Sequence, residues 1–66
     1  MTTKQKKTFA QKIAALEKRR ANASSTEEKA KCETDIMKIM GQLEQQEDFF
    51  EAMADIDTMV QELLAK

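Results

Sequence analysis

Apolar side chains recur at spacings of three and four residues along most of this 66-residue chain. The pattern forms three groups, which are Phe9, Ile13 and Leu16; Cys32, Ile36, Ile39 and Leu43; and Phe49, Met53, Ile56, Val60 and Leu63. Such spacing places each group on one face of an α-helix. Proline is absent and there is one glycine, so little in the composition interrupts a helix. The sequence therefore predicts an all-α fold.

A turn is indicated between the first two apolar groups. Ser25 stands three residues before Glu28, which is the spacing of a capping box at the start of a helix. We expect a first helix over residues 3–21, a turn over residues 22–25 and a second helix beginning at residue 26. All of these elements belong to a single helical domain, because 66 residues leave room for one core at most.

The second helix is expected to be long. Its apolar positions continue to the end of the chain, which favours an antiparallel helical hairpin with a coiled-coil-like second helix over residues 26–65. The apolar spacing slips by one residue within 41–48, so we expect a kink or a break there. Gly41 favours a kink, whereas Asp48 as a helix N-cap would favour a break. A break gives the alternative fold, which is a compact three-helix bundle.

The two helices of such a hairpin differ greatly in length. At 1.5 Å per residue, the first spans roughly 30 Å and the second nearly 60 Å. Apolar side chains beyond the end of the first helix would stay uncovered, and burying each one is worth about 1.5 to 3 kcal/mol. We therefore expect a partner protein or a second copy to cover this segment. The predicted partner-binding residues are Phe49, Phe50, Met53, Ile56, Met59, Val60 and Leu63.

Charge is distributed unevenly along the chain. Residues 1–31 hold nine of the 11 basic side chains and three of the 12 acidic ones, and the remainder hold two and nine. On a helical wheel the first helix has a basic face opposite its apolar face, made of Lys4, Lys7, Lys12, Lys18 and Arg19. This face can be a solvated surface, or it can meet the acidic half of another copy or an acidic partner protein. It can also bind the phosphates of RNA, DNA or an anionic membrane.

The residues that carry most enzyme chemistry are missing. Histidine is absent, so a Cys–His or Ser–His pair cannot form, and Cys32 is the only cysteine. Glu47, Glu51 and Asp55 share one helical ridge, but they lack the additional ligands of di-iron and calcium sites. We therefore expect no enzyme activity, no metal and no cofactor. The lysine-rich start resembles no signal peptide, and no apolar run is long enough to cross a membrane, which predicts a cytoplasmic protein.

Together these features predict a protein that acts by binding. Our interpretation is a non-catalytic subunit, an adaptor or a small chaperone that packs an apolar helix face against another protein or forms an oligomer. The alternative is a basic-helix factor that binds RNA or a ribonucleoprotein. The absence of Tyr, Trp and His leaves the lysine-rich segment without stacking residues for bases, which favours protein binding.

The predicted cap at the turn can be tested by mutation. Replacing Ser24 and Ser25 with alanine should lower the free energy of unfolding by about 1 to 2 kcal/mol, because amides at the start of the second helix lose their acceptor. Thermal unfolding followed by circular dichroism measures the change. An unchanged melting temperature would mean that the second helix begins elsewhere.

Overall fold

The structure of the protein is a computed structural model that describes residues 1–65; Lys66 lies outside the described residues. It contains three α-helices, α1 (Thr3–Ala21), α2 (Thr26–Glu44) and α3 (Phe49–Ala65), and no strand in the described range. The all-α prediction is confirmed, and the compact three-helix bundle fits. The hairpin with one long second helix is not confirmed, because the chain leaves the helix after Glu44 and starts a new one at Phe49.

Side chains and backbone groups next to α1 and α2 satisfy the free amides at their starts. Thr2 and Gln5 form a capping box, in which the Gln5 amide donates to Thr2 Oγ1 at 3.1 Å and the Thr2 amide donates to Gln5 Oε1 at 2.9 Å. At α2, the Glu28 amide donates to Ser25 Oγ at 3.2 Å. The Ser24 amide donates to Glu28 Oε2 at 3.4 Å. Ser25 is therefore the N-cap of α2, at the position that its spacing to Glu28 indicates.

The break between α2 and α3 is a tight turn over residues 45–48. The Gln46 amide donates to the carbonyl of Leu43 at 3.0 Å, and the Phe49 amide donates to the carbonyl of Gln46 at 3.2 Å. Gly41 lies inside α2, so the helix passes through the glycine and ends three residues later. The break lies within the expected range 41–48, and the turn is made by polar residues beyond Gly41.

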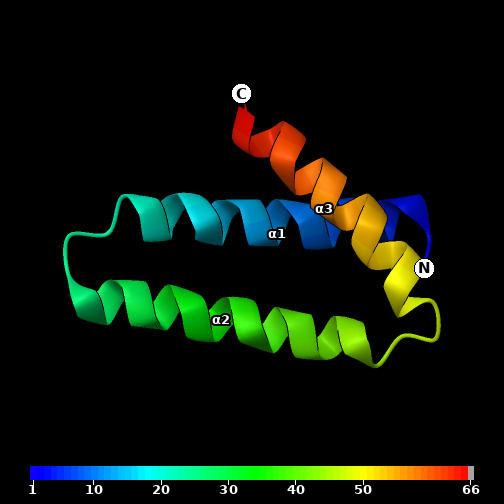
Figure 1. Ribbon diagram of the computed structural model, residues 1–66, viewed down its shortest axis with the longest axis horizontal. Coiled ribbons are helices and arrows are strands. Elements are labelled where there is room, and N and C mark those ends of the chain that lie inside the picture. Colours follow the sequence, from blue (N-terminus) through cyan, green and yellow to red (C-terminus); the bar gives the residue numbers. More distant parts are fainter. Residues whose placement is uncertain (66) are drawn as a thin grey trace.

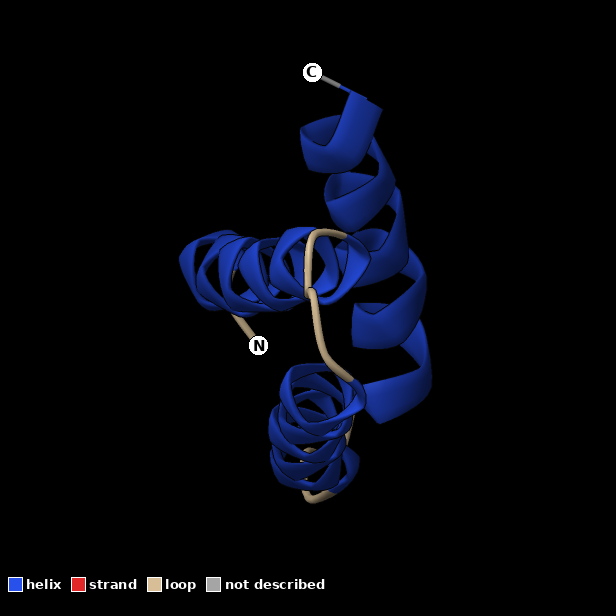
Figure 2. Cartoon of the chain, turned by 90° about the vertical axis from the view of Figure 1, so that its left-hand side faces the viewer, coloured by secondary structure: helices blue, strands red, loops and turns tan. Residues whose placement is uncertain are grey.

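Helix α1 lies at the centre of the bundle. Helices α1 and α2 run antiparallel side by side, and α3 crosses α1 obliquely, with its C-terminal end pointing away from α2 (Figure 1). Seen along the hairpin, α3 lies to one side of the other two helices (Figure 2). Helix α1 packs extensively against both α2 and α3, whereas α2 and α3 touch each other little. The third helix is thus held almost entirely by α1.

The core lies where the three helices meet. Its buried residues are Ala10, Ile13 and Ala14 of α1, Leu43 of α2, and Ala52, Ile56 and Val60 of α3. Leu43 and Ile56 are the largest fully buried side chains. The small side chains of Ala10 and Ala14 let α3 approach α1 closely, which is how Ile56 loses all its contact with solvent.

The folding back of α3 can be tested through this core. Changing Ile56 to alanine should lower the free energy of unfolding by about 2 to 5 kcal/mol, because it removes a fully buried side chain and leaves a cavity. The matched control is Met37→Ala on α2, where the side chain is 72% exposed and the change should stay within about 0.5 kcal/mol. Chemical denaturation of a sample shown to be monomeric measures both. Equal effects of the two changes would mean that α3 is not part of the monomer core.

Candidate interaction surfaces

The predicted partner-binding residues occupy three different environments on α3. Ile56 and Val60 are buried in the core of the chain itself, and Phe50 is 86% exposed. The remaining four are half-buried at the edge of the core, namely Phe49, Met53, Met59 and Leu63. Folding back places the inner face of α3 on α1, so this chain covers most of the segment that a partner was expected to cover. Their role in partner binding stays a prediction.

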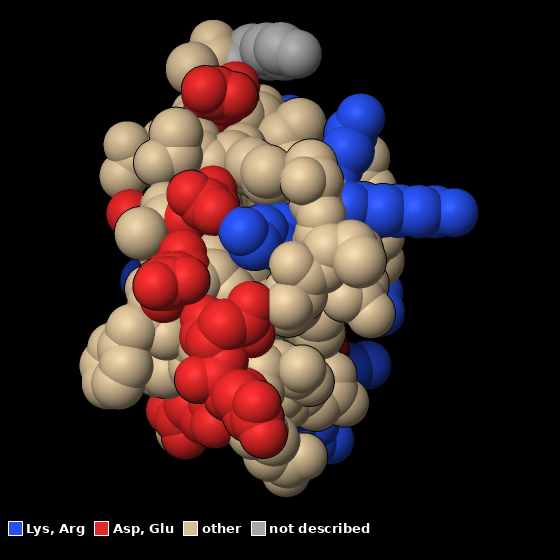
Figure 3. Space-filling view, turned by 90° about the vertical axis from the view of Figure 1, so that its right-hand side faces the viewer, with Lys and Arg blue, Asp and Glu red and all other residues tan. Residues whose placement is uncertain are grey.

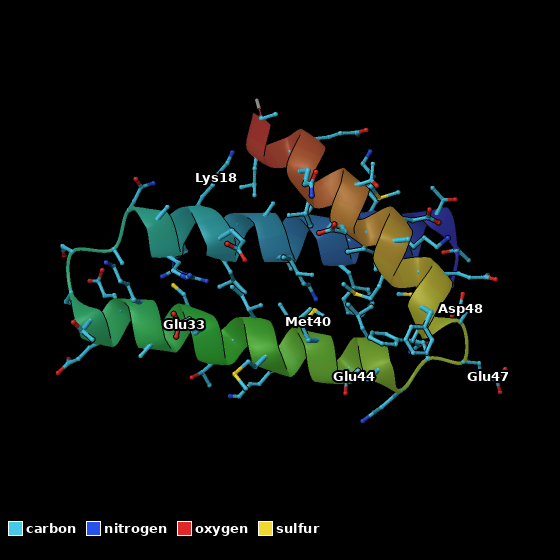
Figure 4. All side chains as sticks on the ribbon, viewed as in Figure 1. Lys18, Glu33, Met40, Glu44, Glu47 and Asp48 are labelled. Atoms are coloured by element: carbon cyan, nitrogen blue, oxygen red, sulfur yellow. The ribbon has the colours of Figure 1, made fainter. Side chains whose placement is uncertain are left out.

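Phe50 is the most exposed large apolar side chain of the described residues. Its ring packs on that of Phe49, with ring centroids 5.3 Å apart and planes inclined by 56°. A shallow hollow beside it is lined by Phe50 together with Glu47, Asp48 and Glu51. Glu47 and Asp48 lie at the turn into α3, and Glu47 points outward (Figure 4). The exposed aromatic side chain of Phe50 therefore has three carboxylates next to it on the surface.

Two further large apolar side chains are exposed among the described residues. Leu64 is 40% exposed and lies 14 residues after Phe50, close to four helical turns, so both residues point to the same flank of α3. Met53 is half-buried between the core and this flank. We call Phe50, Met53 and Leu64 the Phe50 flank. Met37 is exposed separately on α2, and the sequence analysis does not single it out. Met37 directly follows Ile36, and one residue turns an α-helix by about 100°. The position of Met37 in the sequence therefore places it off the apolar face and indicates that it is exposed.

The five residues predicted to form the basic face belong to α1. Lys4, Lys7, Lys12, Lys18 and Arg19 are all exposed. None of them belongs to the three ion pairs found among residues 1–65. Lys18 points from α1 away from α2 (Figure 4), and it lines a hollow between α1 and the end of α3. The five cations are thus exposed along α1, and two of them, Lys7 and Lys18, also border hollows beside α3.

Acidic side chains gather on a different part of the surface. Glu47, Glu51 and Asp55, which we call the acidic ridge, are all exposed. Seen from the side of α3 and the turn, acidic side chains form a nearly continuous band, with basic side chains beside it and along one edge (Figure 3). The folded chain therefore keeps the charge separation of its sequence as two neighbouring surfaces of opposite sign.

Two ion pairs link the N-terminus and α1 to the turn before α3 and to α3 itself. Lys6 Nζ lies 2.6 Å from Asp55 Oδ2, and the ammonium group of Met1 lies 2.6 Å from Asp48 Oδ2. The hydrogen bond to Asp55 raises the pKa of Lys6, and the nearby charges of Asp55, Asp48 and Glu51 add to the effect. The hydrogen bond from the Met1 ammonium lowers the pKa of Asp48. The sequence pattern does not predict the role of Lys6, whose only signal is its position beside the apolar face of α1.

Three further features of the described residues are their metal-ligating groups, the cysteine and the length of the helices. Among residues 1–65, no group of three or more Cys, Asp or Glu side chains is placed to hold a metal ion. Cys32 is a buried free thiol. None of the three helices, as far as they are described, has the length and apolar character that crossing a membrane requires.

Comparison with known proteins leaves the surfaces as the main guide to function. No protein-family model, no curated protein and no solved structure matches this chain. The function must therefore be inferred from the Phe50 flank, the basic face and the acidic ridge.

The ion pair between α1 and α3 should make stability depend on alkaline pH. Because the pKa of Lys6 is raised above 10.5 in the folded chain, its stabilisation is complete below 10.5 and is lost as pH rises through the folded pKa. Lys6→Gln removes this pair, so the variant should lose less stability than the wild type over that interval. Lys4→Gln, on the basic face, is the control. Urea unfolding at a series of pH values measures the difference, and parallel curves for the wild type and Lys6→Gln would contradict it.

Proposed function

We propose that this chain is a non-catalytic protein-binding subunit, an adaptor or a small chaperone, and that it docks a partner protein on the Phe50 flank of α3. The observation that carries the proposal is the 86% exposure of the Phe50 side chain, the highest among the large apolar side chains of the described residues. An aromatic side chain left in solvent gives up about 1.5 to 3 kcal/mol that burial would contribute. A partner pocket that receives this ring recovers that stabilisation.

The residues around Phe50 indicate which kind of partner surface would complement this side chain. Glu47, Asp48 and Glu51 border the ring, so an apolar pocket rimmed by lysine or arginine complements it. Aromatic anchors with a charged rim are typical of residues that dominate interface energy. Met53 and Leu64 extend the contact along α3, and the flexible thioether of Met53 adapts to partners of different shape.

A second function is supported by the basic face. Five exposed cations on one side of α1, outside the ion pairs of the described chain, form a surface that can meet phosphates. This favours the alternative of a factor that binds RNA or a ribonucleoprotein. The acidic ridge beside it and the absence of aromatic residues between the lysines count against it. Protein binding through Phe50 is therefore the preferred proposal.

Mutation of Phe50 tests the proposed docking surface. Phe50→Ser should leave the free energy of unfolding within about 0.5 kcal/mol of the wild type, because the ring is exposed. It should weaken binding of a purified partner at least about tenfold, since a central aromatic anchor is worth more than 1 to 2 kcal/mol. Isothermal titration calorimetry on the partner that co-purifies with the wild type measures this. Met37→Ser is the matched control, because it removes another exposed apolar side chain from a different helix.

Salt distinguishes this proposal from the alternative. Binding through the Phe50 flank should weaken only modestly as salt screens the charges at its rim, because burial of the ring does not depend on those charges. RNA bound by the basic face should dissociate steeply as salt rises. A partner that binds Phe50→Ser and the wild type equally, and that salt releases, would support the basic face as the functional surface instead.

A further inference from the structure

We propose that two copies of this chain exchange their third helices. In the exchanged dimer, residues 45–48 join α2 and α3 into one long helix, and α3 of each copy packs on α1 of the other. The proposal concerns association of the chain with itself. It does not rest on the docking of another protein, because the contacts exchanged are those between α1 and α3.

The packing of α3 makes the exchange feasible. Apart from the turn, α3 is held by α1 and touches α2 little. Its buried residues Ala52, Ile56 and Val60 join a cluster to which α1 contributes Ala10 and Ala14. Because every copy carries the same α1 surface, α3 of a second copy fits it with the same contacts. The exchange therefore conserves the core while changing which chain supplies each half of it.

The turn between α2 and α3 is suited to straightening. Residues 45–48 are Gln-Gln-Glu-Asp, without glycine or proline, and no residue of the described chain has a positive φ. Gln45 already has a helical backbone, with φ −77° and ψ −11°. Two hydrogen bonds, from the amides of Gln46 and Phe49, close the turn, and a continuous helix replaces them with its own. Gln and Glu are good helix formers, so the straight form carries no strong local penalty.

The apolar pattern also continues across this turn. Leu43 lies seven residues after Ile36, and Phe50 lies seven residues after Leu43. In one continuous helix these three residues fall on the same face, as in a heptad seam. In the monomer this seam ends at Leu43. In the continuous helix Phe50, which is 86% exposed in the monomer, would extend it. The two turn segments meet at the two-fold axis of the dimer, so the Phe50 rings of both copies can cover each other.

The acidic residues near the turn predict how conditions act on the dimer. Glu44, Glu47 and Glu51 of both copies come together at the axis, and their repulsion opposes dimerisation. Salt screens that repulsion, so ionic strength should shift the equilibrium toward the dimer. A dimer formed by docking the basic face on the acidic ridge would respond in the opposite direction.

A pair of charge reversals tests the exchange directly. Lys6→Asp and Asp55→Lys each place like charges across the α1–α3 contact, where the wild type has an ion pair of 2.6 Å. When the two variants are unfolded together and refolded, an exchanged heterodimer restores both ion pairs, and no other species restores either. Native mass spectrometry and sedimentation equilibrium should show the heterodimer in excess over both homodimers. Monomers alone, or dimers in statistical proportion, would overturn the proposal.

A change in the turn provides the second test. Glu47→Pro leaves the amides of Gln46 and Phe49 free to close the turn, but a proline inside the continuous helix of each chain should lower the dimer association constant by about 100-fold or more. Glu47→Ala is the matched control and should dimerise at least as well as the wild type. Sedimentation equilibrium at high and low salt measures both variants. Equal dimerisation of Glu47→Pro and Glu47→Ala would show that the association does not use a continuous helix, and would exclude the exchange.

Discussion

The packing of α3 on α1 is the contact on which the rest of this structure depends. Helices α2 and α3 touch little, so among the described residues the α1 surface around Ala10 and Ala14 holds the third helix. Two methyl side chains there allow a close approach, and Ile56 is fully buried as a result. A domain of this size buries only about 60% of the surface of its unfolded chain, so it depends strongly on each contact between helices.

The packing of α3 on α1 also determines which side chains remain exposed and available for binding. It takes Ile56 and Val60 into the core, and it leaves Phe50 on the surface among the carboxylates of the turn. It also places the basic face of α1 beside the acidic ridge of α3, with the Lys6–Asp55 ion pair between the two helices. The molecule therefore presents one apolar flank and two charged surfaces, which is the basis for proposing a binding function.

The candidate sites differ in how well the sequence predicts them. The five residues of the basic face are all exposed, because the side of a helix on which a residue lies depends only on its periodicity. The apolar site is harder to predict, since periodicity separates the face of Ile56 from that of Phe50 but does not say what covers either face. Ile56 is fully buried in this chain and Phe50 is 86% exposed, because α3 turns back after residues 45–48 and packs on α1. The ion pair of Lys6 depends on the same direction.

The sequence by itself determined the helices, the cap at Ser25, the apolar face of each helix and the separation of charge. These features follow from interactions within a few residues, namely helix propensity, capping and periodicity. Only the tertiary structure decided that residues 45–48 form a turn. The local preference there is weak, because leaving the helix costs a few hydrogen bonds of about 1 kcal/mol each. Burying the inner face of α3 contributes about 1.5 to 3 kcal/mol for each large side chain, so long-range packing outweighs the local preference for one long helix.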